Sequence, residues 1–420
     1  MLSFRAVGFL LWALPVAGTA SGEEWKFAFT PAAARPGFTL AGGDLRFEAG
    51  QGFGFVQREG APPVFAVAVP EGNYDVTVRL GHPQEATETT LRAEARRLML
   101  HSVATQAEQE VTRTFTVNVK RPDIAGGGRV SVDNREKGAP NWDEVLTVEV
   151  QGRAPGLVSM EIKPAPNALT IFLAGDSTVN DQPQGPYFGW GQMLPRFFQR
   201  GVAVSNHAQS GLALHSFERQ QRLRKILTMM KPGDYLFIQF GHNDQKDKAE
   251  GAGPFTTYKS NLKRFIDAVR KKGGFPVLVT PMERRRWTRG TLQTTLDAYA
   301  EAVRQTGAEE QVPLIDLQAM SIALYRALGP DGSKRAFVHY PANALPGHPE
   351  AIKDDSHHSA FGGYELARCV VEGIRQAIPA LAAKLAADAG VFDPARPDDP
   401  ATLSLPMSAV HDPVEKPAGN

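Results

Sequence analysis

The sequence is poor in three features that would each have indicated a class of protein. Cys369 is its one cysteine, so no intramolecular disulfide can form and the fold has to depend on its packed core. That cysteine falls in an apolar stretch of helical spacing, which predicts a buried packing role. Beyond the first twenty positions, no run approaches the ~20 apolar residues that a membrane-spanning helix requires. We therefore expect no membrane insertion of the mature chain.

An excess of charge of one sign is also missing. The 46 basic residues nearly balance the 45 acidic ones, and no basic stripe recurs along the chain. Nucleic-acid binding is therefore not expected. His207, His215, His339 and His348 lack the spacing of a metal-ligand set, so we expect neither a metal nor an organic cofactor.

The first twenty residues have the composition of a cleaved signal peptide. A single cation, Arg5, precedes an apolar stretch, and small residues close the segment at Gly18–Ala20. Residues 1–20 are therefore predicted to be removed. The mature protein is expected to be secreted or periplasmic.

Residues 23–163 alternate apolar and polar side chains in short runs. Examples are Tyr74–Leu80, Phe115–Val119 and Leu146–Val150. Period-two alternation between Gly- and Pro-containing turns predicts an all-β sandwich of jelly-roll type. Val69–Tyr74 also resembles the strand entry of galactose-binding-like modules. This accessory domain could bind glycan or buttress its neighbour, and the lack of an evident aromatic platform favours the buttress.

A second pattern begins after the linker 164–167. Apolar strands alternate with helical patterns, including Tyr258–Lys271 and Thr291–Thr306. This order predicts an α/β domain over residues 167–388, with a parallel sheet between two helical layers. Residues 391–420 are rich in Pro, Asp and Ala, and are predicted to be a surface extension or disordered.

Four polar blocks lie at informative places in this second domain. Gly175–Val179, Asn206–Gly211 and Gly241–Asp244 each follow an apolar strand, where open α/β sheets place their chemistry. The fourth, Asp354–Ser359, precedes a predicted helix over Tyr364–Ala377. The four blocks in this order resemble those of the SGNH (GDSL-type) hydrolases, and most closely the rhamnogalacturonan acetylesterase branch of carbohydrate esterases.

The resemblance extends from residue 169 to about 380. It includes shorter matches between and after the blocks: Gly189–Gly191, Lys231–Tyr235, Phe337–Pro341 and Gly362. One departure is Gly211-Leu212-Ala213, where that branch often carries Gly-Arg-Ser. The departure leaves the glycine amide in place but removes a cation and a hydroxyl near the expected acyl site.

Ester hydrolysis needs a serine whose proton can be taken by a neighbouring base. Ser177 is the expected nucleophile, His357 the base and Asp354 the carboxylate that orients the imidazole. The pair Asp355 and His358 has the same spacing and also satisfies the bare pattern. We prefer Asp354 and His357, because Ser359 and Gly362 then fall at the offsets of the family.

The resemblance also implies three donors for the oxyanion of the tetrahedral intermediate. They are the backbone amides of Ser177 and Gly211 and the side-chain amide of Asn243. Glycine permits close backbone approach, and an Asn side chain donates without carrying charge.

The cluster 284–287 is a local exception to the balanced charge. Arg284 and Arg286 could hold uronate carboxylates and Trp287 could stack on a sugar ring. The alternative is a solvated loop with a packed tryptophan.

The residues predict a serine ester hydrolase, and the resemblance implies a carbohydrate O-acetylesterase that acts on acetylated plant cell-wall polysaccharide, with pectic rhamnogalacturonan the leading substrate. Acetylxylan esterase or broad small-ester activity is the alternative within the same chemistry. A glycan-binding protein that has lost its activity is the alternative of another class.

Overall fold

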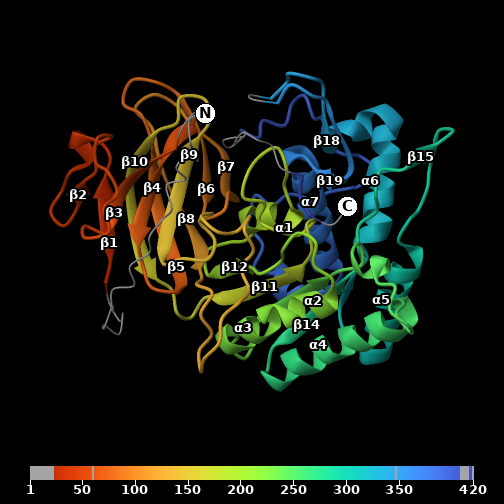
Figure 1. Cartoon of the computed structure of the whole chain (residues 1–420). Helices are drawn as coiled ribbons and strands as arrows, with labels where there is room; N and C mark the ends of the chain where they lie inside the picture. Colours follow the sequence, from red (N-terminus) through yellow and green to blue (C-terminus); the bar gives the residue numbers. More distant parts are fainter. Residues whose placement is uncertain (1–22, 59–60, 346–347, 407–415, 419–420) are drawn as a thin grey trace, which may run out of the picture.

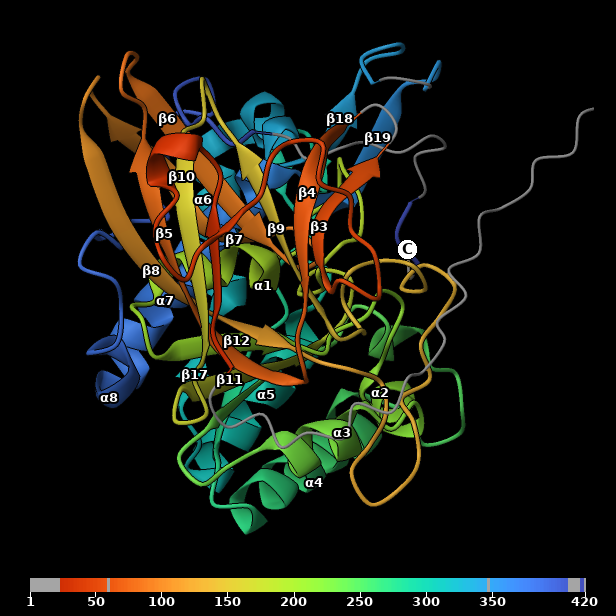
Figure 2. The same cartoon turned by 90° about the vertical axis from the view of Figure 1, so that its left-hand side faces the viewer.

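The computed structural model describes residues 23–58, 61–345, 348–406 and 416–418, and two parts of different architecture lie side by side in it (Figures 1 and 2). The predicted signal peptide lies outside the described residues. Within them, no helix combines the length and apolar character needed to cross a bilayer.

The first part consists of two five-stranded β-sheets. Residues from both sheets fill one core between them, among them Val76 and Val78 from one sheet and Phe65 and Leu91 from the other. Except for the parallel β1–β2 pair, neighbouring strands pair antiparallel. In sheet order, the strands are β2 (Thr39–Leu40), β1 (Trp25–Ala28), β10 (Leu157–Pro164), β5 (Gly72–Gly81) and β8 (Glu110–Val119), then β3 (Phe53–Arg58), β4 (Ala61–Ala68), β9 (Val145–Gln151), β6 (Thr87–Ala93) and β7 (Arg97–Thr105).

This part has the antiparallel pairing that the alternating sequence predicts. Along β5, buried and half-exposed positions alternate as expected for a strand with one face in the core. The jelly-roll and galactose-binding-like assignments, and the predicted domain boundaries, stay predictions. We refer to these strands and their connections as the β region.

The second part is built on a parallel sheet, which confirms the predicted α/β class. Alternate residues of β11 enter different cores: Ile171 and Leu173 on one face, Phe172 and Ala174 on the other. In sheet order, its strands are β12 (Val202–Asn206), β11 (Leu169–Gly175), β13 (Tyr235–Gln239), β14 (Phe275–Val279) and β17 (Leu314–Ile315).

Helices cover both faces of this sheet (Figure 1). One face packs against α1 (Trp190–Met193), α6 (Leu317–Gly332) and α7 (Ala360–Ala377), and the buried Cys369 lies in that core as predicted. The other face packs against α2 (Leu214–Arg219), α3 (Arg222–Met229), α4 (Lys259–Lys271) and α5 (Asp297–Glu310). The short α8 (Pro379–Ala382) follows α7.

Two small hairpins complete this part, and one of them corrects a prediction. The helix expected over Thr291–Thr306 begins only at Asp297, because Thr291–Leu292 forms β16 and pairs with β15 (Trp287–Thr288). Arg289 and Gly290 both have positive φ, the geometry of a two-residue hairpin turn. The second hairpin joins β18 (Phe337–Tyr340) to β19 (Ile352–His358).

Buried charges join the two parts. Arg97 of β7 donates from Nε to Asp181 Oδ2 at 2.6 Å, and the two side chains are 1% and 0% exposed. Glu136, in the connection between β8 and β9, pairs with Arg222 of α3 at 2.5 Å, again almost without exposure. These contacts make the β region part of the same packed body as the parallel sheet.

The described part of the C-terminal extension crosses from one part to the other. Residues 391–406 contain no helix or strand. Asp398 pairs with Arg368 of α7 at 2.5 Å. Further along, Ser404 O lies 2.6 Å from His101 Nε2 of β7, so this segment runs over the surface with defined contacts.

Candidate active site

Three of the four blocks meet at one edge of the parallel sheet. The strands β12, β11 and β13 are neighbours in that order, so the segments after their carboxyl ends converge. Ser177 follows β11, Gly211 follows β12 and Asn243 follows β13. Ser177 is 2% exposed and therefore lies in a sheltered position.

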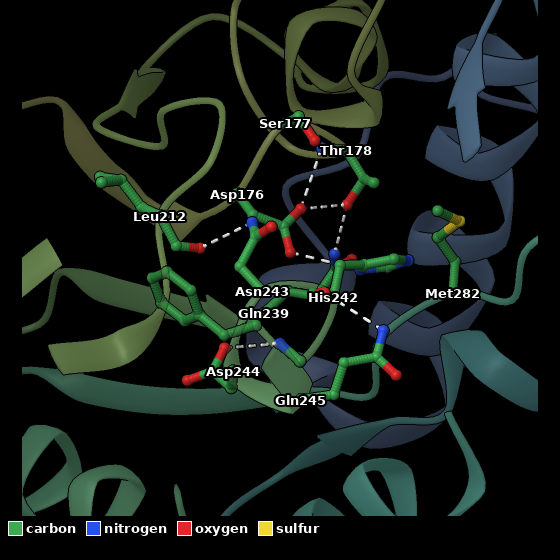
Figure 3. A network of polar contacts seen from close by, with 12 residues as sticks. Asp176, Ser177, Thr178, Leu212, Gln239, His242, Asn243, Asp244, Gln245 and Met282 are labelled. Carbon is green, nitrogen blue, oxygen red and sulfur yellow. Dashed lines mark hydrogen bonds and ion pairs between the residues drawn. The ribbon is translucent and has the colours of Figure 1, made fainter. Parts of the chain in front are cut away.

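The turn that carries Ser177 is held by its neighbour Asp176 (Figure 3). One carboxylate oxygen of Asp176 accepts from the backbone N–H and the hydroxyl of Thr178, at 3.0 and 2.8 Å. The other lies 3.2 Å from His242 Nδ1. Burial alone would raise the pKa of Asp176, but His242 and the Thr178 donors lower it below its ordinary value.

The fourth block brings an imidazole to the serine. His357 Nε2 lies 2.9 Å from Ser177 Oγ, and His357 Nδ1 lies 2.8 Å from Asp354 Oδ2. The other Asp354 oxygen accepts the backbone N–H groups of Ser356 and His357, at 2.9 and 3.0 Å. Burial acts to raise the pKa of Asp354, but the hydrogen bonds and charge of His357 outweigh it and hold that pKa well below its usual range.

The neighbouring acid and histidine lie in other networks. Asp355 pairs with Arg285 and with His339, both at 2.8 Å. His358 packs in the core, where its Nε2 lies 2.8 Å from the Tyr325 hydroxyl. Of the two pairs that the sequence allowed, the structure brings Asp354 and His357 to Ser177.

The three expected oxyanion donors follow neighbouring strands of the parallel sheet, at the same edge. Within the described residues, the backbone N–H groups of Ser177 and Gly211 donate to no protein acceptor. Gly211 adopts φ +84°, a conformation that favours glycine. Asn243 donates one amide hydrogen to Leu212 O at 3.1 Å and accepts from Lys246 Nζ at 3.2 Å, which leaves its second amide hydrogen available.

The three residues after β14 that were predicted to bind substrate differ in their exposure and in their contacts. Arg284 donates to Thr295 Oγ1 at 3.1 Å and lies 3.4 Å from His242 O, so its guanidinium faces the third block. Arg286 is exposed. Trp287 is partly buried against the core, and its indole N–H lies 3.2 Å from Ser333 Oγ. A packed tryptophan offers less of its ring to a sugar, and the substrate-binding role of this cluster stays a prediction.

The structure adds residues that the sequence did not indicate. Tyr187 stands edge-on to His357, with 5.8 Å between ring centroids. Gln182 Nε2 donates to Ser177 O at 2.7 Å. Lys416 Nζ lies 3.7 Å from Asp354 Oδ2, and a Cβ at position 211 would lie 3.2 Å from Ala418 Cβ. No motif marks these residues. Gln182 is only five residues from Ser177, and the others reach the site through contacts between distant parts of the chain.

No group of three or more His, Cys, Asp or Glu side chains in the described part of the chain is arranged to hold a metal ion.

Comparison with known proteins places this site in a family. The sequence pattern of the GDSL-like lipase/acylhydrolase family matches residues 173–351. Rhamnogalacturonan acetylesterase RhgT of Bacillus subtilis (strain 168) is 44% identical over 211 residues, which span 50% of this chain and 90% of that protein. The chain belongs to the GDSL-like lipase/acylhydrolase family. It is therefore a carboxylic ester hydrolase.

Other similarities extend this comparison. The probable rhamnogalacturonan acetylesterase YesY of the same bacterium is 37% identical over 212 residues, which span 49% of this chain and 92% of that protein. The crystal structure of the Bacillus subtilis protein YxiM is 24% identical with a TM-score of 0.46, and covers 84% of this chain and 98% of its own.

Proposed function

We propose that this protein is a carbohydrate O-acetylesterase that hydrolyses acetyl esters of pectic rhamnogalacturonan through an acyl-enzyme intermediate. The observation that carries this proposal is the continuous chain of contacts from Ser177 through His357 to Asp354, at 2.9 and 2.8 Å. A hydroxyl, an imidazole and a carboxylate in this order constitute an activated nucleophile.

In the first half-reaction, Ser177 Oγ attacks the acetyl carbonyl carbon while its proton passes to His357 Nε2. Asp354 accepts the hydrogen bond of His357 Nδ1–H and stabilises the imidazolium. The oxyanion then receives hydrogen bonds from the amides of Ser177 and Gly211 and from Asn243 Nδ2. When the C–O bond to the sugar breaks, His357 returns its proton to the departing sugar oxygen.

In the second half-reaction, a water replaces the sugar. His357 takes a proton from this water as the water oxygen attacks the acetyl-serine carbonyl. The second tetrahedral intermediate collapses, acetate leaves and Ser177 regains its proton. No step in either half-reaction needs a metal or an organic cofactor.

The substrate part of the proposal rests on relatives. RhgT bears the name rhamnogalacturonan acetylesterase and YesY the name probable rhamnogalacturonan acetylesterase, and they are 44% and 37% identical to this chain over 211 and 212 residues. Arg286 is exposed beyond β14 and Arg284 faces the third block, so both are proposed contacts for uronate carboxylates, with Trp287 beside them. Acetylxylan or small esters remain the alternative within this chemistry. We further propose a secreted or periplasmic location, where plant polysaccharide would be met.

A non-catalytic glycan-binding role is disfavoured by geometry. In a protein that has lost catalysis, nothing requires the base to stay within hydrogen-bond reach of the serine. Here His357 Nε2 lies 2.9 Å from Ser177 Oγ.

The test is acetate release from acetylated rhamnogalacturonan and from acetylxylan, measured side by side for the wild type and Ser177→Ala. Release by the wild type that disappears in the variant supports the serine mechanism, and the faster polymer identifies the substrate. Absence of release from either polymer by the wild type would contradict the proposal.

A further inference from the structure

The connection between β8 and β9 leaves the β region and reaches the active-site part of the molecule. Residues 120–144, here called the excursion, run down to α2 and α3 in Figure 2. Ser131 N donates to Gln220 O at 3.1 Å, and Lys225 Nζ donates to Asp123 O at 2.6 Å. Trp142 packs edge-on against His207 with 5.3 Å between ring centroids. The excursion therefore packs against the helices and loop that follow β12.

Asp133 lies at the point where the excursion meets the second block. One of its carboxylate oxygens caps a turn by accepting the N–H groups of Arg135 and Glu136, at 2.9 and 3.1 Å. The other accepts a hydrogen bond from Gln209 Nε2. The two oxygens of Asp133 thus connect the local turn of the excursion to Gln209.

Gln209 stands two residues before the proposed oxyanion donor Gly211. Its backbone N–H donates to Gly175 O at 3.1 Å, and its side-chain oxygen accepts from Asn180 Nδ2 at 3.0 Å. Gln209 is 1% exposed, so water does not replace its partners easily. Its backbone carbonyl accepts Leu212 N–H at 3.3 Å, which closes the turn that presents Gly211.

Glu136 fixes the same turn of the excursion from its other side. Its carboxylate receives Arg222 Nη1 at 3.1 Å and Nη2 at 2.5 Å, and Trp142 Nε1 donates to it at 2.7 Å. Arg222 Nη1 also donates to His207 O at 3.1 Å. The second block is thus tied to the excursion at residue 207 and at residue 209.

We propose that Asp133 is a positioning residue of the active site, which acts through Gln209 to hold the turn that directs the Gly211 N–H toward the oxyanion. The β region then contributes to catalysis by the esterase and is not a separate module. This inference rests on the proposed function, because it assigns to Asp133 an effect on the acyl-transfer step.

The chain offers an exchange experiment. Asp133→Asn keeps the shape and the turn cap but turns an amide toward the amide of Gln209. Gln209→Glu removes the donor and sets two carboxylates against each other. In the double variant D133N/Q209E, the new amide at position 133 donates to the new carboxylate at position 209. That carboxylate can still accept from Asn180, and the net charge equals that of the wild type. The hydrogen bond is restored with its direction reversed.

The measurement is the rate of hydrolysis of 4-nitrophenyl acetate per active site, with sites counted by titration of Ser177 with an organophosphate. Each single variant is expected to lower kcat about tenfold with KM within about twofold, as for loss of one group that acts in the transition state. The double variant is expected to recover to within about threefold of the wild type. Asp123→Asn, in an exposed pair with Arg129 on the same excursion, is the matched control and is expected to retain wild-type kcat.

Counting sites separates turnover from folding, and Gln209→Met, which adds no charge, serves if Gln209→Glu does not fold. Wild-type kcat in the single variants, or a double variant no better than the poorer single variant, overturns the positioning role. Lack of hydrolysis by the wild type, or retained hydrolysis in Ser177→Ala, would instead contradict the proposed function.

Discussion

Asp354 and Asp355 are adjacent in the chain, yet their carboxylates serve different networks. Asp354 lies 2.8 Å from His357 Nδ1, whereas Asp355 pairs with Arg285 and His339 outside the serine site. Between Val338↔Asp354 and Phe337↔His358, β19 advances four residues while β18 advances one. The extra residues of β19 form a bulge that contains both Asp354 and His357, whose Oδ2 and Nδ1 atoms lie 2.8 Å apart.

This separation predicts opposite results for two similar substitutions. Asp354→Asn should lower kcat by about 10⁴-fold, because an amide facing His357 Nδ1 stabilises the wrong tautomer. Asp355→Asn should retain kcat within about threefold, since its carboxylate contacts no proposed catalytic group. Steady-state hydrolysis of 4-nitrophenyl acetate distinguishes the two. A large loss in Asp355→Asn with activity retained in Asp354→Asn would reverse the assignment.

Asn243 offers a test of the oxyanion donors. Asn243→Ala removes a donor that is proposed to act only when charge develops, so kcat should fall by about 10²–10³-fold with KM little changed. The control is Asn261→Ala on α4, where the amide oxygen accepts from Arg264 instead. Pre-steady-state acylation would show whether the loss lies in the first half-reaction. A kcat within about threefold of wild type would remove Asn243 from the proposed mechanism.

The Arg97–Asp181 pair predicts an effect on stability. Asp181→Asn leaves the Arg97 guanidinium charged and buried without its carboxylate, and should lower the free energy of unfolding by about 3–5 kcal/mol. Urea unfolding followed by tryptophan fluorescence measures this change. Asp123→Asn, in the exposed pair with Arg129, should unfold at the wild-type urea concentration. Equal urea midpoints for the wild type and both variants would mean that the buried pair contributes little to the free energy of unfolding.

The buried carboxyl group of Glu94 is expected to make the stability of the fold depend on pH. Burial raises the pKa of Glu94 to about 8 from an ordinary value of 4.5, so the folded state favours the protonated carboxyl group. The stabilising contribution of the protonated Glu94 is complete below the pKa that the group has in the unfolded chain. It is lost as the pH rises through the pKa that the group has in the folded state. Glu94→Gln keeps an acceptor for Thr147 N–H, which donates to Glu94 at 3.1 Å, and removes the titration.

The expected result is a difference in melting temperature, variant minus wild type, that is more positive at about pH 8 than at about pH 5. Differential scanning calorimetry at the two pH values measures it, with the exposed Glu48→Gln as control. A difference that does not change with pH would show that Glu94 stays ionised in the fold.

The sequence was informative wherever a short-range pattern determines structure. The apolar run of β11 predicts a strand buried on both faces, and polar residues at its end predict a site at the sheet edge. The preference for Asp354 over Asp355 came from the spacing to Ser359 and Gly362. Ser359 caps α7 by accepting Gly362 N–H at 3.3 Å, which gives that spacing a structural reason.

Contacts between residues far apart in the chain could not be predicted from the sequence. Asp133 and Gln209 are 76 residues apart, and nothing near either residue indicates that they share a hydrogen bond. The late start of α5 was missed because the turn Arg289-Gly290 favoured a hairpin over the helical pattern of residues 291–296. Trp287 was weighed as a sugar platform, but its packing against the core depends on residues far along the chain.

The buried pair of Arg97 and Asp181 also constrains how this protein can change over evolutionary time. Loss of either charge leaves the other without compensation, so drift at one position selects for a matching substitution at the other. Exchange of the β region for that of a distant homologue would separate such co-adapted partners.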